Sequence, residues 1–201
     1  MQISPQQLIA FFWLIFIGML TCVAPAAQAE PKLRLVSNVT WSQPDPWFGG
    51  FSGIEVSNNG HQITLISDRA TLVITDMIRE NGTLKAMQLR NQVSLTDADG
   101  TALGEDQSDL EGLAIDVNGR AFVSFEHDHR VARLNLETGR VSGSTRSPYF
   151  KNLIPNSGLE ALAVHPDGTL YTLPESSGGK NTPFPVFAFV QNEWQVVQHV
   201  K

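Results

Sequence analysis

Five carboxylates recur at corresponding positions of a segment that the sequence repeats. Glu111 and Glu160 each begin an apolar run, whereas Asp68, Glu126 and Glu175 each follow a second apolar run. Carboxylates that converge raise one another's pKa unless a cation lies among them, and oxygen ligands of this kind suit Ca²⁺. The five acids are therefore predicted metal ligands. The alternative is that each accepts backbone N–H bonds from a neighbouring unit and binds no metal.

Basic side chains near these acids could receive a phosphate group. Arg69 lies beside the first of the repeated acids, Arg130 closely follows the second unit's last acid, and Lys180 follows a Gly-Gly pair. His127 and His129 stand at alternate positions, so in a strand they would share a face and could act together. These five residues are predicted to bind substrate. The alternative for each is an exposed surface charge or a polar turn.

An acidic loop ahead of the second unit is a further candidate for cation binding. Asp97 and Asp99 stand at alternate positions before Gly100, as at the start of an EF-hand calcium loop. However, Ala102 occupies the position where that loop needs glycine, and Ser108 the position of its bidentate glutamate. A solvated acidic loop is therefore the better interpretation.

No nucleophile or cofactor motif assigns a catalytic residue. Ser52 lies in a Gly-Phe-Ser-Gly segment, which is not the Gly-x-Ser-x-Gly of a hydrolase elbow. The sequence contains no P-loop, dinucleotide fingerprint or zinc-cysteine pattern. If the chain hydrolyses esters, water activated by a metal ion is the better mechanism. The catalytic residues stay unassigned.

The recurring acids belong to a unit that the sequence contains three times. Each unit has an apolar segment, a tight turn with glycine, a second apolar segment and two further strand-like segments. Turn pairs such as Asn-Gly, Asp-Gly and Thr-Gly supply the positive φ that most hairpins need. The predicted four-stranded units span residues 51–95, 109–150 and 158–200 of a single domain over 30–201.

Four antiparallel strands in roughly 40–50 residues are typical of a β-propeller blade. We therefore predict an all-β chain with a propeller fold, in which the first strand of each blade lines the channel and the repeated acids converge at one mouth. A β-sandwich is the alternative, but it does not require the first two strands of every four to carry the same residues. No segment after residue 29 shows a convincing helical period.

Three blades leave the ring open, because closed propellers have roughly four to eight. A further strand is predicted over residues 33–41, of the kind that often completes the last blade of a closed ring. We expect that the sequence is the N-terminal half of a longer propeller, in which case it could be an inactive fragment. The alternative is a half-propeller that forms a homodimer.

The first 29 residues predict a secretory signal peptide. They contain no charged side chain, and an apolar run over residues 8–24 precedes an Ala-Gln-Ala cleavage site. An uncleaved anchor is the alternative. Cleavage would leave residues 30–201 without cysteine and with a net charge of −6, which argues against nucleic acid or an anionic membrane as partner. The predicted location is the periplasm or the exterior, with no stable membrane association.

Short motifs from all three units occur in a defined order. They are Phe51-Ser-Gly-Ile54 with Ser67-Asp-Arg69, Asp97-Ala-Asp-Gly100, Asp109-Leu-Glu-Gly-Leu-Ala114 with Val123-Ser-Phe-Glu126, Asn156-Ser-Gly-Leu-Glu-Ala-Leu-Ala163, and Pro166-Asp-Gly168 with Glu175. In order and spacing they resemble the bacterial phytase-like family, described as having esterase-like activity. The resemblance implies an exported propeller of about six blades and hydrolysis of small phosphoesters or other esters, often with calcium. A binding or scaffold propeller without catalysis is the alternative function.

Overall fold

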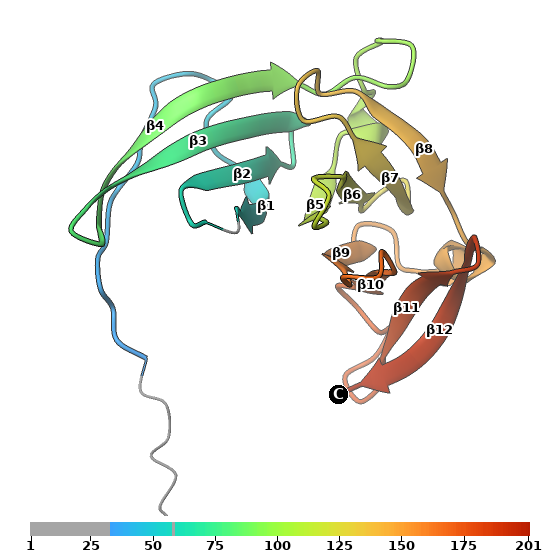
Figure 1. Ribbon diagram of the computed structural model, residues 1–201. Coiled ribbons are helices and arrows are strands. Elements are labelled where there is room, and N and C mark those ends of the chain that lie inside the picture. The colour runs from blue at the N-terminus through green and yellow to red at the C-terminus, as the bar shows by residue number, and fades with distance from the viewer. Residues whose placement is uncertain (1–32, 58) are drawn as a thin grey trace, which may run out of the picture. The chain divides into compact units, whose positions relative to one another are not determined.

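The computed structural model describes residues 33–57 and 59–201 (Figure 1). Ser37–Lys201 form one compact unit, and every strand of the described chain lies within it. The predicted signal peptide over residues 1–29 lies outside the described residues. Helical structure in the described part is confined to the short 3₁₀ turns η1 (Glu105–Gln107) and η2 (Pro148–Asn152). Among the described residues, no helix has the length and hydropathy needed to cross a bilayer.

Three four-stranded antiparallel sheets make up this unit, which confirms the predicted all-β, propeller-like fold. The first sheet contains β1 (Phe51–Val56), β2 (Gln62–Ser67), β3 (Thr71–Glu80) and β4 (Thr83–Ser94). The second contains β5 (Leu110–Ile115), β6 (Ala121–Phe125), β7 (Arg130–Leu134) and β8 (Val141–Thr145). The third contains β9 (Leu159–Val164), β10 (Leu170–Pro174), β11 (Phe184–Val190) and β12 (Glu193–Val200). Strands pair in chain order within each sheet, so β1, β5 and β9 each form a sheet edge.

Glycine turns join the first two strands of every sheet, as the sequence predicts. Gly60, Gly119 and Gly168 adopt φ values of 67°, 78° and 92°, in the left-handed region that favours glycine. In the second sheet Asp116 supports the turn, because its Oδ1 accepts the N–H of Arg120 at 2.8 Å. These turns set the register of the hairpins that carry the repeated acids.

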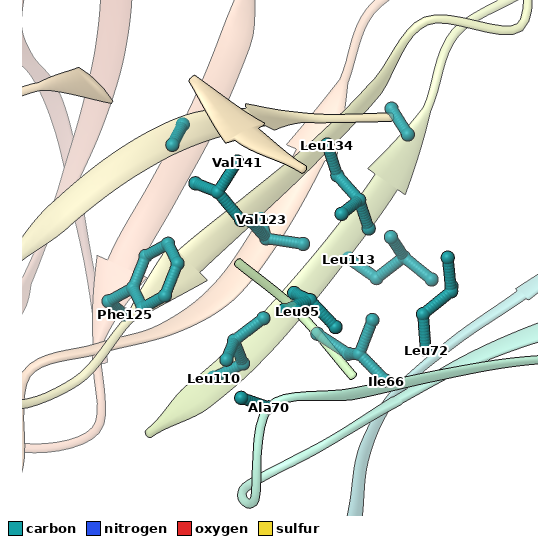
Figure 2. Close-up of a cluster of buried hydrophobic side chains, with 12 residues drawn as sticks. Ile66, Ala70, Leu72, Leu95, Leu110, Leu113, Val123, Phe125, Leu134 and Val141 are labelled. Carbon is teal, nitrogen blue, oxygen red and sulfur yellow. The ribbon is translucent and has the colours of Figure 1, made fainter. Parts of the chain in front are cut away.

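The inner strands lie side by side, with β5 between β1 and β9, and the ring stays open (Figure 1). One apolar core fills the space between the first and second sheets, and it includes Ile66 and Leu72 of the first sheet and Leu113 and Phe125 of the second (Figure 2). A second core joins the second and third sheets. It contains Phe122, Val131, Phe150, Leu159, Leu170, Phe187 and Trp194. Burial of these side chains in water-free contact is what holds neighbouring sheets together.

A third core lies on the other face of the first sheet, and the chain's own N-terminal segment covers it. Ile63 and Leu65 are only 8% and 6% exposed there, because Trp41 and Trp47 pack over them. The strand predicted over residues 33–41 is wrong: this segment forms no strand. A strand needs a neighbouring edge to pair with, and the blade that would supply it is not part of the described unit.

Candidate functional site

The acids that follow the second strand of each sheet occupy equivalent backbone positions. The N–H groups of Asp68, Glu126 and Glu175 each donate to a carbonyl that immediately precedes the first strand of the same sheet. The acceptors and the N···O distances are Gly50 at 2.9 Å, Asp109 at 3.0 Å and Gly158 at 2.8 Å. This pairing sets the end of each hairpin, so the three acids leave their sheets at corresponding points.

The acids of the inner strands lie among these carboxylates. Glu111 and Glu160 take the second position of β5 and β9, and both are half-buried. Burial, together with the charges of Glu160, Asp109, Glu126 and Asp68, raises the pKa of Glu111 to about 8. Burial and neighbouring carboxylates raise the pKa of Glu160 as well. Acids from all three sheets therefore influence one another electrostatically.

The tightest group of ligand atoms lies in the second sheet. Asp109, Glu126 and His127 each place one such atom within 4.8 Å of the others. His127 Nδ1 is 2.6 Å from Asp109 Oδ2. Burial, a hydrogen bond with Asp109 and the nearby carboxylates raise the pKa of Glu126 to about 7. Asp109 is thus paired with an imidazole on one side and a carboxyl that retains a proton near neutral pH on the other.

The two histidines do not act from one strand face. Residues 126–129 form the turn between β6 and β7, so strand alternation does not apply to them. His127 approaches Asp109, whereas His129 packs against Gly158, where a Cβ atom would lie 2.2 Å from its Nδ1. Burial lowers the pKa of His129. His129 is therefore a contact between the second and third sheets rather than a second ligand beside His127.

Arg130 is buried and already paired. Its guanidinium bonds to Asp128 and lies 3.7 Å from the centroid of the Phe125 ring. Arg146 Nη2 also bonds to Asp128, at 2.5 and 2.6 Å from its two oxygens. Arg130 therefore supports the turn that carries Glu126, and Arg146 is the more exposed cation of this cluster.

The remaining predicted basic residues lie on the surface. Arg69 is exposed, with its Nε 3.7 Å from Asp68 Oδ1, and Lys180 is exposed in the loop between β10 and β11. Asp97 and Asp99 use their Oδ1 atoms within their own loop, where each accepts the N–H of Thr101. This geometry supports the interpretation of that segment as a solvated acidic loop.

The donor set fits a hard cation. Its members are carboxylates, which Ca²⁺ prefers, and the most buried of them keep protons at neutral pH when no positive charge is near. A cation among Asp109, Glu126 and Glu111 would relieve this repulsion. The imidazole of His127 is a poorer calcium ligand, so it suits the orientation of Asp109 better than coordination.

Two residues of this region were not predicted from the sequence. Asp109 stands outside the repeated acids, although its place two residues before Glu111 is a signal that could have found it. Arg146 lies in the link after β8, and nothing in the sequence connects it to Asp128. Both depend on the packing of loops against the β6–β7 turn.

Comparison with solved structures returns distant similarities. The chain is 17% identical to glutaminyl cyclase from Myxococcus xanthus, with a TM-score of 0.47. The matched region covers 64% of this chain and 52% of the cyclase. A functionally unknown protein from Desulfotomaculum acetoxidans is 14% identical with a TM-score of 0.43, and the match covers 74% of this chain and 41% of that one. The β-propeller domain of Cps50 (Swd1) from Myceliophteria thermophila is 12% identical with a TM-score of 0.43, and the match covers 73% of this chain and 38% of that one. The chain thus spans about half the length of the first of these structures or less.

Comparison of sequences identifies a family. No curated protein matches the chain. The family model described as phytase-like, with the esterase-like activity of phytase, matches residues 46–200. This match includes all three sheets and every predicted site residue, in agreement with the resemblance noted from the motifs. The chain therefore belongs to the phytase-like family.

Proposed function

We propose that this chain is an exported hydrolase that cleaves small phosphoesters or other esters at the cluster of carboxylates around Asp109, Glu111 and Glu126. Family membership supports this reaction class. The observation that carries the proposal is the convergence of partly buried acids from three sheets, where burial and the neighbouring carboxylates raise the pKa values of Glu111 and Glu126 to about 8 and about 7. Shifts of this size are typical of functional sites.

The two shifted glutamates suit proton transfer at neutral pH. Glu111 keeps its proton at pH 7, so it can donate that proton to the oxygen of a leaving alcohol. Glu126 titrates near pH 7 when no cation is bound and can accept a proton from an attacking water; a bound cation would favour its ionised form, which is the form that a general base requires. Asp109 holds both Glu126 and His127 by hydrogen bonds and so sets their orientation.

Calcium is the cation that this site suits best. Asp109 and Glu126 would hold it, with Glu111 and Glu160 close enough to feel its charge. When bound, such an ion supplies charge neutralisation and polarisation of an ester or phosphoryl oxygen. Of the basic residues, Arg69 and Lys180 are exposed and could receive a phosphate, whereas Arg130 is occupied by Asp128.

Turnover of chromogenic esters tests the proposal directly. The purified chain should hydrolyse p-nitrophenyl phosphate or p-nitrophenyl acetate with calcium, and Glu126→Gln should reduce kcat by about 100-fold or more if Glu126 acts as general base. Glu137→Gln is the matched control, because Glu137 is an exposed glutamate in the β7–β8 turn. If turnover is no faster than the buffer blank in calcium and also in EDTA, the proposed hydrolase activity is rejected.

A binding or scaffold propeller without catalysis is the second candidate. One observation favours it: Glu55 Oε1 accepts the N–H of Ile115 at 3.2 Å, so this chain does use a carboxylate to tie neighbouring sheets. If the repeated acids serve the same purpose, glutamine at Glu111 should leave ligand response unchanged and alter only stability. Fractionation of the producing cells tests export, which we expect to place the chain in the periplasm or the medium.

A further inference from the structure

Two crevices occupy corresponding places at the acid-bearing end of the second and third sheets. Each lies between the link that enters its sheet, the loop after the sheet's second strand, and the sheet's third and fourth strands. The crevice of the second sheet has a volume of about 340 Å³, and that of the third about 250 Å³. The two loops begin at Glu126 and Glu175, so both crevices lie at the end of the sheets that carries the repeated carboxylates.

The two crevices differ in the side chains that line them. The crevice of the second sheet contains five charged residues, which are Asp97, Asp99, Asp128, Arg130 and Arg146. None of the described residues that line the crevice of the third sheet is charged. We call it the apolar crevice, and its large apolar side chains are those of Tyr149, Leu153, Ile154, Pro185, Phe187 and Val196. A group that enters it must therefore be apolar as well.

The walls of the apolar crevice belong to the contact between the second and third sheets. Phe187 is 2% exposed and is part of the second core, against which Leu153 and Val196 also pack. The ring of Tyr149 lies 6.2 Å from that of Phe187, and Tyr149 and Ile154 are 50% and 42% exposed. The opening thus arises where the link between β8 and β9 crosses this contact. It does not depend on what lies beyond the third sheet.

Both walls of the apolar crevice lead directly to the carboxylates. Ser176 in the loop wall follows Glu175, whose N–H donates to the carbonyl of Gly158 at 2.8 Å. The other wall is the link between β8 and β9, which ends at that same glycine. The charge of Glu175 also contributes to the raised pKa values of Glu160 and Glu126. A molecule seated in the crevice can therefore place its polar end among the acids.

We infer that the apolar crevice holds the alkyl or aryl group of an ester substrate, so that the chain prefers uncharged esters with a short apolar group to phosphomonoesters. The inference rests on the proposed function and narrows its substrate class. An apolar cavity of about 150 Å³ accommodates benzene, so a crevice of about 250 Å³ has room for a phenyl ring or a short alkyl chain. A phosphate dianion there would lose its hydration and find no cation.

Binding of ester analogues tests the apolar crevice without any turnover. N-butylacetamide and N-hexylacetamide replace the ester by an amide, which resists hydrolysis, and NMR titration gives their dissociation constants. The hexyl compound should bind about 15-fold more tightly, because each of its two additional CH₂ groups contributes roughly a factor of four when buried. Equal affinities for the two amides would overturn the inference.

Substitutions within the crevice locate this binding. Ile154→Asp should lower the affinity for N-hexylacetamide by about 10-fold or more, because it places a charge against the apolar group. Ser177→Trp, which fills the crevice from the loop, should have the same effect. Ile78→Asp is the matched control, since Ile78 is 40% exposed in β3 of the first sheet. Thermal unfolding checks that each variant folds, and unchanged affinity in both folded crevice variants would overturn the inference.

Competition with turnover connects the apolar crevice to the carboxylates. N-hexylacetamide should raise the KM for p-nitrophenyl acetate and leave kcat unchanged. If the chain turns over no ester but binds the amides in proportion to chain length, the proposed hydrolase is wrong and the crevice remains a site for apolar ligands. If turnover occurs and the bound amide does not compete, the crevice does not hold substrate. A kcat/KM for p-nitrophenyl phosphate above that for p-nitrophenyl acetate would also overturn the inference.

Discussion

The inner strands of the second and third sheets have nearly the same sequence but different surroundings. β5 reads Leu-Glu-Gly-Leu-Ala-Ile and is buried at Gly112, Leu113 and Ala114. β9 reads Leu-Glu-Ala-Leu-Ala-Val, and Ala161 and Ala163 are exposed. β5 has a neighbouring sheet on each side, whereas β9 has one on a single side. Burial in this fold is therefore decided by the neighbours of a strand more than by its own residues.

The first sheet, like the third, has a neighbouring sheet of the described chain on one side only, but its other face is not left open. Its face away from the second sheet is covered by the chain's own aromatic segment, in which Trp41, Phe48 and Phe51 contact one another. The corresponding face of the third sheet leaves Tyr171 and Leu173 half-exposed. The outer face of the first sheet is thus covered by the aromatic segment that precedes it in the chain, whereas the outer face of the third sheet stays open. This contrast can be tested.

The inner strands of the second and third sheets should respond very differently to a larger side chain at their small residue. Gly112→Val should destabilise the folded chain by about 3 kcal/mol, because a Cβ there would lie 2.6 Å from Leu162 Cβ and 2.9 Å from its backbone nitrogen. Ala161→Val should change the stability of a single chain by less than about 0.5 kcal/mol. Urea unfolding at low chain concentration measures both. Equal losses would show that the third sheet is covered after all.

The aromatic segment should stabilise the first sheet less than the second core stabilises the contact between the second and third sheets. Trp41→Ala should cost about 2 kcal/mol, less than for a fully buried tryptophan because Trp41 is half-buried. Trp194→Ala, at a side chain 4% exposed between the second and third sheets, should cost about 3–5 kcal/mol. Chemical denaturation followed by tryptophan fluorescence distinguishes them. A Trp41 variant as stable as the parent would mean that the segment does not protect the first sheet.

Calcium binding should depend more on the second sheet than on the third. If the site exists, saturating calcium at about 100 times Kd should add about 2.7 kcal/mol of stability, seen as a rise in melting temperature. Glu126→Gln should abolish that rise, and Glu175→Gln should reduce it less, because Glu175 is exposed. Glu137→Gln is the control. A rise that survives glutamine at Glu126 would remove this residue from the ligands.

The smallest expected effect is a pH dependence that compares equivalent acids. Burial raises the pKa of Glu111 from 4.5 to about 8, so the folded chain binds this proton more tightly than the unfolded chain. The stability that it contributes is present below pH 4.5 and is lost as pH rises towards 8. Glu111→Gln should therefore raise the melting temperature at pH 9 by about 3 °C and leave it unchanged at pH 4.

The same substitution at Glu160 provides the comparison within the third sheet. Its pKa is raised for the same reasons, by burial and neighbouring carboxylates. Because β9 has an uncovered side, Glu160→Gln should produce a smaller rise at pH 9, measured by differential scanning calorimetry without added calcium. A larger rise for Glu160 than for Glu111 would contradict the view that the second sheet holds the centre of the site.

Prediction from sequence succeeds where a local signal sets the structure. Glycine turns and alternating apolar runs predict three sets of four strands, and the structure contains them. The positions of Glu111 and Glu126 relative to their strands follow from the same signals. The predictions fail where pairing depends on distant chain: residues 33–41 form no strand, and His127 and His129 separate because their segment is a turn.

By itself the sequence determined the repeating unit, its turns and the recurrence of the acids, because each of these depends on residues close together in the chain. Only the tertiary structure decided that Asp109 joins Glu126 and His127, that Arg130 is occupied by Asp128, and that one end of the series is covered by aromatic side chains. These outcomes depend on which sheets become neighbours, and contact between segments far apart in sequence is not encoded in any local pattern.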